Sequence, residues 1–184
     1  MKRVLVTALA TFLLSSCGYN RIQSLDEQVN SFESQIKVQL QRRADLVPNL
    51  VATVKGFAEH EQEIFDAVTQ ARAQVGGALQ SGNLAEMAVA NQTLNSALGR
   101  LIAIAEDNPE IQSNENFRML QDQLEGTENR ISTARQDYNA AVQAYNSYIR
   151  RFPQVMTAKI VGAKAREYFE VTDESATKAP EVEF

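Results

Sequence analysis

Apolar residues recur along most of the chain at alternating steps of three and four, the spacing of a helix that buries one face. The clearest run lies in the C-terminal half, where the steps alternate strictly for five heptads: Phe117, Leu120, Leu124, Thr127, Ile131, Ala134, Tyr138, Ala141, Tyr145, Tyr148 and Phe152. A stripe of that length requires partner helices packed alongside it at coiled-coil-like angles. We expect Pro153 to end this helix, because proline cannot continue the hydrogen-bond ladder.

The N-terminal half predicts a second long helical stretch over residues 24–75. Its apolar pattern slips by one position at Pro48. A proline inside a helix removes one backbone hydrogen bond and bends the rod. The stretch is therefore either one helix kinked near Pro48 or two helices that meet there. Gly76-Gly77 and Ser81-Gly82-Asn83 are expected to interrupt the chain after it.

A further helix of about 24 residues is predicted to begin after Asn83, a good N-cap, and to stop at Asn108-Pro109. The apolar residues 155–161 and the stretch 167–170 are expected to form a last helix or a strap over the end of the bundle. Strand-like alternation is absent from the sequence. The expected fold class is all-α: an elongated antiparallel helical bundle of three long helices plus a short C-terminal fourth, with coiled-coil-like packing.

The first residues, MKRVLVTALATFLLSSC, have the layout of an export signal: two basic residues, an apolar run over residues 4–14, and small residues before Cys17. As a helix the apolar run would be about 16 Å long, roughly half the hydrocarbon thickness of a bilayer. The ending Leu14-Ser15-Ser16-Cys17 resembles a bacterial lipobox, whose cysteine is acylated on sulfur. The alternative is an ordinary signal peptide or short signal anchor in which Cys17 is incidental.

Both interpretations place the body outside the cytoplasm, because the positive charges precede the apolar run. Two or more acyl chains would make the anchor stable. We therefore expect a lipoprotein signal peptide at 1–16, a lipid-anchored linker at 17–23, a bundle at 24–170 and an acidic tail at 171–184. The tail is either frayed or docked on a partner. The expected location is the cell membrane or outer membrane, with a periplasmic body in a two-membrane bacterium; Gly18 favours the outer membrane.

The charge and the scarcity of metal-binding side chains argue against nucleic-acid binding and against a zinc site. The formal charge is −5, and without residues 1–16 there are 16 basic and 23 acidic side chains, a charge of −7. Such a body is a poor partner for nucleic acid or for anionic lipid headgroups. The single cysteine and the single histidine, His60, leave no Cys/His cluster for zinc. No cofactor is expected, and Glu59-His60-Glu61 reads as a solvated helix face.

Several separate blocks of the sequence resemble the LemA family. They are QLQRRADLVPNL (39–50), VKGFAEHE (54–61), NENFRMLQDQLEGTENRI (114–131), YNAAVQAYNSYIRRFP (138–153), and EYFE followed by APEVEF. The resemblance covers residues 19–184 in order. It implies a membrane-anchored, extended antiparallel helical domain with no established enzymatic activity, and some relatives take part in building magnetosome membranes. Family members commonly begin with a transmembrane segment, whereas this chain has a lipobox-like start.

Two polar belts interrupt the apolar pattern and are candidate interaction sites. The first comprises Arg42, Arg43 and Asp45, and the second comprises Glu125, Glu128 and Arg130. Arginine forks bind carboxylates and phosphates bidentately, so the first belt could be a recognition surface. The alternative is that both belts pair helices with one another. We expect a contact between them, through Arg43 and Glu128.

The repeated Tyr-Asn pairs of residues 138–153 suggest a surface for a partner. The heptad directs the aromatic side chains inward, and Asn139, Asn146 and Arg150 lie beside the stripe or at the helix end. We expect these three residues to form any partner surface there.

The sequence favours a non-enzymatic, membrane-anchored scaffold or adaptor in the bacterial cell envelope, which binds other envelope proteins and could form a homo-oligomer. A membrane-organising or remodelling protein is the alternative. A hydrolase is a weaker third, because the sequence shows no spacing that would cluster titratable groups.

Overall fold

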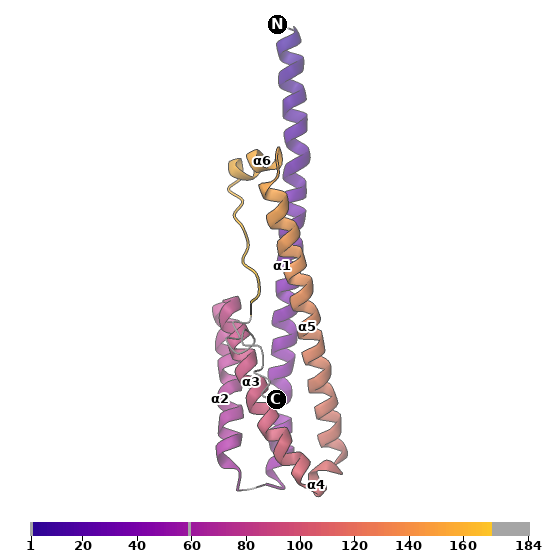
Figure 1. Ribbon diagram of the computed structural model, residues 1–184, viewed down its shortest axis with the longest axis vertical. Helices are drawn as coiled ribbons and strands as arrows, with labels where there is room; N and C mark the ends of the chain where they lie inside the picture. Colours follow the sequence, from indigo (N-terminus) through magenta and orange to yellow (C-terminus); the bar gives the residue numbers. More distant parts are fainter. Residues whose placement is uncertain (1, 59, 171–184) are drawn as a thin grey trace, which may run out of the picture. The chain divides into compact units, whose positions relative to one another are not determined.

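The computed structural model describes the backbone of residues 2–58 and 60–170, and the side chains within that part from residue 18 onward. Apart from turns and one extended segment, the described residues are helical and contain no strand, which confirms the all-α class. The described residues form six helices where four were expected: α1 Lys2–Lys55, α2 Gln62–Ser81, α3 Leu84–Asp107, α4 Pro109–Gln112, α5 Glu115–Arg150 and α6 Gln154–Ile160 (Figure 1).

The chain divides into two compact units, and α1 and α5 each contribute a segment to both. Unit 1 comprises Met1–Val38 and Arg130–Tyr168, and unit 2 comprises Gln39–Asn129 and Phe169–Phe184. Unit 1 therefore contains α6, whereas unit 2 contains α2, α3 and α4. Each unit is described by itself below.

In unit 2, α1 continues through Pro48, and the break between helices falls at residues 56–61. Proline has no N–H, so the carbonyl of Ala44 loses the donor that residue 48 would normally supply. Nε of Arg72, on α2, donates to that carbonyl at 2.8 Å. Because Ala44 is buried, this bond satisfies an acceptor that water does not reach. Of the two alternatives, one helix through Pro48 is confirmed, although this helix ends at Lys55 and does not continue to residue 75.

Of the two expected interruptions, the one at Gly76-Gly77 is wrong, because α2 runs through both glycines to Ser81. A glycine costs a helix only about 1 kcal/mol relative to alanine, and Val75 and Ala78 on either side are buried. The interruption at Ser81-Gly82 is confirmed: the helix ends at Gly82, whose φ of 71° is left-handed and whose N–H bonds the carbonyl of Ala78.

The helix predicted after Asn83 is confirmed as α3, with the expected 24 residues. Oδ1 of Asn83 accepts from the amides of Ala85 at 2.9 Å and Glu86 at 3.3 Å. This cap satisfies two of the four donors that the first turn of a helix leaves free. The core of the helix is apolar and includes Leu94, Leu98 and Leu101, each at most 2% exposed.

The stripe of α5 is buried as expected from Phe117 to Ala141, but it then moves by one residue. Val142 and Ile149 are buried, whereas Phe152 is 80% exposed and Tyr148 is only half-buried. A straight helix has 3.6 residues per turn, so a strict seven-residue repeat drifts by about 20° per heptad. Over five heptads this drift amounts to about one residue. The inward placement expected for Tyr148 and Phe152 is therefore wrong.

Unit 1 pairs the first described part of α1 with the end of α5. The carboxylate of Glu33 on α1 lies close enough to Tyr138 on α5 to raise its pKa, and Asp26 on α1 raises the pKa of Tyr145 on α5 in the same way. Residue numbers thus fall along α1 as they rise along α5, so the two segments are antiparallel. Residues 18–23 belong to α1 and Ile22 is 1% exposed, so the linker expected at 17–23 is not one over these residues.

After α6 the chain is extended over residues 163–170, so the bundle expected to reach residue 170 ends in a non-helical segment. We call residues 163–168, which lie in unit 1, the strap. Both elements foreseen for the end of the chain are present, since α6 is a helix and the strap follows it (Figure 1).

Candidate functional site

The contact expected between the two polar belts is present in unit 2. Arg43 of α1 is 6% exposed and its guanidinium forms an ion pair with the carboxylate of Glu128 on α5. Nδ2 of Asn95, on α3, donates to Oε1 of Glu128 at 3.2 Å. Burial lowers the pKa of Arg43 to about 10, which leaves the side chain positive at neutral pH. One buried ion pair and an amide thus join three helices.

The other belt residues lie on the surface. Arg42, Asp45, Glu125 and Arg130 are exposed, and Asp45 accepts a hydrogen bond from Gln41 one turn earlier, at 2.8 Å. The recognition-surface interpretation therefore does not apply to Arg43, which the fold uses internally.

Asn146 ties the strap to α5 in unit 1. Its Nδ2 donates to the carbonyl of Arg166 at 2.8 Å, and its Oδ1 accepts from the amide of Arg166 at 2.8 Å. Asn146 is 5% exposed, so its expected place on a partner surface is wrong. Of the other two candidates, Asn139 is half-buried and Arg150 is exposed.

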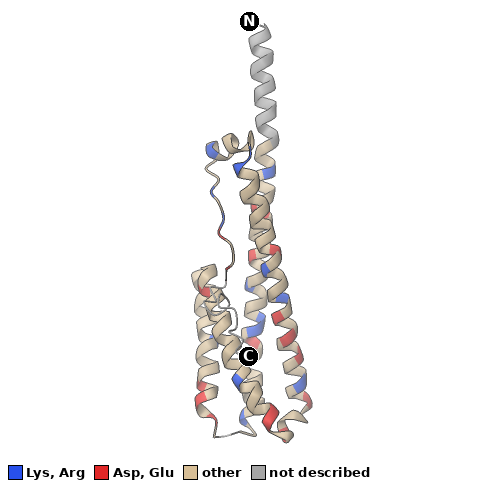
Figure 2. Cartoon of the chain, viewed as in Figure 1, with Lys and Arg blue, Asp and Glu red and all other residues tan. Residues whose placement is uncertain are grey.

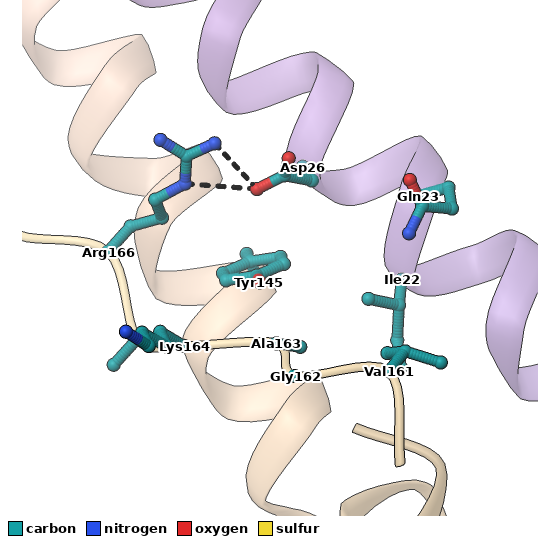
Figure 3. Close-up of a pocket in the computed structure, with 10 residues that line it drawn as sticks. Ile22, Gln23, Asp26, Tyr145, Val161, Gly162, Ala163, Lys164 and Arg166 are labelled. Atoms are coloured by element: carbon teal, nitrogen blue, oxygen red, sulfur yellow. Dashed lines mark hydrogen bonds and ion pairs between the residues drawn. The ribbon is translucent and has the colours of Figure 1, made fainter. Parts of the chain in front are cut away.

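The side chain of Arg166 crosses from the strap to α1. Its Nε and Nη2 both reach Oδ1 of Asp26, at 2.9 and 2.8 Å (Figure 3). Nη2 also donates to Oδ1 of Asn30 at 2.8 Å. Burial lowers the pKa of Arg166, but the hydrogen bond and charge of Asp26 raise it by more, so the net shift is upward. Arg166 therefore stays charged, and the strap is bound to α1 through Arg166 and to α5 through Asn146.

No sequence pattern singles out Arg166, Asp26 or Asn30 as site residues. Asp26 and Asn30 lie one turn apart beside the apolar residues Leu25 and Val29, a placement shared by many surface residues. The partner of Asp26 is 140 residues away in the chain. A single sequence contains no local signal for such a pair.

A cavity of about 390 Å³ lies where the strap, α1 and α5 meet (Figure 3). Its lining comprises Ile22, Gln23 and Asp26 of α1, Tyr145 of α5, and residues 161–166. Burial, and then the charge of Asp26, raise the pKa of Tyr145, so its hydroxyl remains a hydrogen-bond donor at neutral pH. Because Arg166 already engages the Asp26 carboxylate, the arrangement suits binding of a polar group better than proton transfer.

Tyr138 anchors the other end of the strap. Its hydroxyl donates to the carbonyl of Glu167 at 2.9 Å. Burial, followed by the charge of Glu33, raises its pKa to about 12. The phenol is therefore neutral and serves as a structural donor.

Some of the expected features lie outside the described side chains. Cys17, the candidate lipid-attachment residue, and the tail 171–184 belong to that group. Among the residues that are described, no group of three or more His, Cys, Asp or Glu side chains could hold a metal ion. Over the same part of the chain, no helix has the length and apolar character needed to span a bilayer.

Comparison with known proteins identifies relatives over most of the chain. The model of the LemA family matches residues 32–184. Magnetosome proteins MamQ 1 and MamQ 2 of Paramagnetospirillum magneticum are each 31% identical over 188 residues, which cover 90% of this chain and 68% of the relative. Magnetosome protein MamQ of Magnetospirillum gryphiswaldense is 30% identical with the same coverage. The chain therefore belongs to the LemA family.

Proposed function

We propose that the protein is a lipid-anchored helical scaffold or adaptor of the cell envelope, with its body outside the cytoplasm, and that it acts by binding. The observation that carries the proposal is the continuity of α1 from Gly18 to Lys55. The part of this helix that follows the proposed lipid-bearing Cys17 supplies a segment to both units. The membrane attachment would thus pass into the body without a flexible linker.

The polar contacts of both units support a mechanical role. Arg166 joins the strap to Asp26, and Arg43 joins α1 to Glu128 on α5. These charged side chains are engaged with each other, so they hold the strap on α1 and α1 on α5 rather than present reactive groups. A non-enzymatic role agrees with this use of charge.

Cross-linking in living cells tests the scaffold directly. A photoreactive amino acid replaces Val38 in unit 1 or Val89 in unit 2, which are 60% and 61% exposed, in the full chain. We expect discrete adducts with other envelope proteins from at least one position. Gln28, exposed and polar on α1, is the control position and should give fewer adducts.

If the protein is a lipid-anchored scaffold, the anchor is needed to bring the body to its envelope partners and thus to form the adducts. Cys17→Ala should therefore abolish them while leaving the folded body intact. Illumination that yields only the unmodified chain from both valine positions would contradict the scaffold.

A membrane-organising role is the second candidate, favoured by relatives named as magnetosome proteins and by exposed apolar side chains at α6. The full chain, reconstituted in vesicles, should then change vesicle shape in electron micrographs. Vesicles indistinguishable from protein-free ones would remove this candidate.

A further inference from the structure

Large apolar side chains are unusually exposed around α6 in unit 1. Phe152 is 80% exposed, Met156 59%, Ile160 84% and Val161 38%, and Tyr19 at the start of the described part of α1 is 45% exposed. Apolar side chains gathered in this way commonly mark a surface that contacts a partner or a membrane. Contact with water alone does not explain a set of this size within so short a segment.

The same segment is basic although the whole chain is acidic. No Asp or Glu occurs between Asp137 and Glu167, and α6 carries blue but no red in Figure 2. The basic residues in this interval are Arg150, Arg151, Lys159, Lys164 and Arg166. All except Arg166 are exposed. The local charge is thus opposite to the formal charge of −5, and the poor match to anionic headgroups expected from the net charge does not hold for this end of unit 1.

The segment lies beside the point where the apolar N-terminal run leads into the body. A Cβ placed on Gly18 would lie 3.5 Å from Oγ1 of Thr157, on α6. Cys17, the proposed site of lipid attachment, directly precedes Gly18. The Cα atoms of neighbouring residues lie only about 3.8 Å apart. With lipid on Cys17 held in a bilayer, α6 lies within reach of the bilayer interface.

We propose that α6 and its flanks, residues 150–164, lie on the bilayer interface and bind anionic lipid headgroups. This inference rests on the proposed anchor, which places the segment at the membrane. The apolar side chains would enter the boundary between headgroups and acyl chains, while Arg151, Lys159 and Lys164 contact phosphates. A seven-residue helix is too short to hold a protein on a membrane alone, but the anchor raises its effective concentration at the surface.

Depth-dependent fluorescence quenching tests the contact in the full chain. The variants Ile160→Cys and Val38→Cys carry a thiol-linked fluorophore and are reconstituted in phosphatidylglycerol/phosphatidylethanolamine vesicles that contain nitroxide-labelled lipid. Both positions are exposed and lie in unit 1, at 84% and 60%. We expect quenching at position 160 to exceed that at 38 by at least threefold. Equal quenching at the two positions would overturn the proposal.

A matched pair of charge variants tests the headgroup contact. The first replaces Arg151, Lys159 and Lys164 by Gln, and the second replaces Lys55, Arg100 and Arg118, which are exposed residues of unit 2. Both change the net charge equally. We expect only the first to lower quenching at position 160, by at least twofold, and only in anionic vesicles. Equal effects of the two variants, or equal quenching in phosphatidylcholine, would overturn the headgroup assignment.

The labelling stoichiometry separates this inference from the proposed anchor. One fluorophore per chain in Ile160→Cys means that Cys17 is blocked, as a lipidated residue would be. Two fluorophores mean that Cys17 is free, and the anchor is then wrong. In that case the same comparison of positions 160 and 38 in the Cys17→Ala background still decides whether α6 contacts the bilayer.

Discussion

Individual polar side chains replace hydrogen bonds that the backbone cannot make by itself. Pro48 leaves the Ala44 carbonyl without its helical donor, and Arg72 supplies one from α2. The proline that looks like a helix breaker is thereby tied to a neighbouring helix. The same logic applies to Asn146, whose amide replaces a strand partner for the extended strap.

The link between Pro48 and Arg72 predicts energetic coupling. Arg72→Met keeps the aliphatic stem but removes the donor, and should lower the free energy of unfolding by about 1–2 kcal/mol. In a Pro48→Ala background the new amide can bond Ala44, so the same change should cost about 1 kcal/mol less. Denaturant titration of the four proteins measures the coupling. Arg100→Met, an exposed control on α3, should have little effect, and an equal loss from Arg72→Met in both backgrounds would contradict the link.

The buried pair of Arg43 and Glu128 predicts a larger coupling. Either Arg43→Ala or Glu128→Ala leaves a charge without its partner and should lower the free energy of unfolding by about 3 kcal/mol. The double variant should lose at least about 1 kcal/mol less than the two single losses together. The exposed pair Arg42 and Glu125 provides the control cycle, for which additivity is expected. Additivity in both cycles would show that the buried contact does not stabilise unit 2.

Tyr138 predicts a loss of stability at high pH. Folding raises its pKa from 10.0 to about 12, because the buried site disfavours the phenolate. The stabilisation is complete below pH 10 and is lost as the pH rises towards 12, which corresponds to about 2–3 kcal/mol. Between pH 9 and pH 12 the wild-type free energy of unfolding should fall by that much more than that of Tyr138→Phe. Tyr19→Phe, at an exposed position, should follow the wild type; parallel curves for all three proteins would refute the assignment.

Among the elements, the strap is the non-helical segment in an otherwise helical unit 1. It has no regular structure, and its described contacts reach Asn146 and Tyr138 on α5 and Asp26 and Asn30 on α1. A segment held by a few side chains rather than by a ladder opens locally when one of them is removed.

The strap therefore gives a sharp prediction for hydrogen exchange. Asn146→Ala removes the acceptor of the Arg166 amide, whose exchange should accelerate at least tenfold, whereas the amides in the middle of α5 keep their protection. Gln143→Ala, on the exposed side of the same helix, should leave the Arg166 amide unchanged. Unchanged exchange of that amide in Asn146→Ala would show that other contacts hold the strap.

The elements themselves were largely predictable, because periodicity and caps are local. The bounds of α3 follow from Asn83 and Asn108, and the stripe of α5 holds from Phe117 to Ala141. The sequence left Pro48 open between one helix and two, and the contact with Arg72 supports one. The errors arise where burial outweighs a local preference, as at Gly76-Gly77, or where small angular drift accumulates, as at Phe152. The contact of Arg43 with Glu128 could be predicted from the two polar belts. The hydrogen bonds of Arg166 to Asp26 and Asn30 could not, because these residues are too distant in sequence for any local pattern.

In the whole molecule, α1 would connect the proposed lipid anchor to the helical body. The side chains of that helix are described from Gly18, one residue after Cys17, and the LemA family model matches residues 32–184. The basic and apolar surface around α6 lies in the same unit as the start of this helix. Both features give the protein a defined end at which it would meet a bilayer.

The most direct test of this account is metabolic labelling of cells with a fatty-acid analogue, comparing the wild type with Cys17→Ala. We expect the wild-type protein to incorporate the analogue and to fractionate with membranes, and Cys17→Ala to lose both properties. Unchanged incorporation in Cys17→Ala would contradict the lipid anchor and, with it, the proposed scaffold.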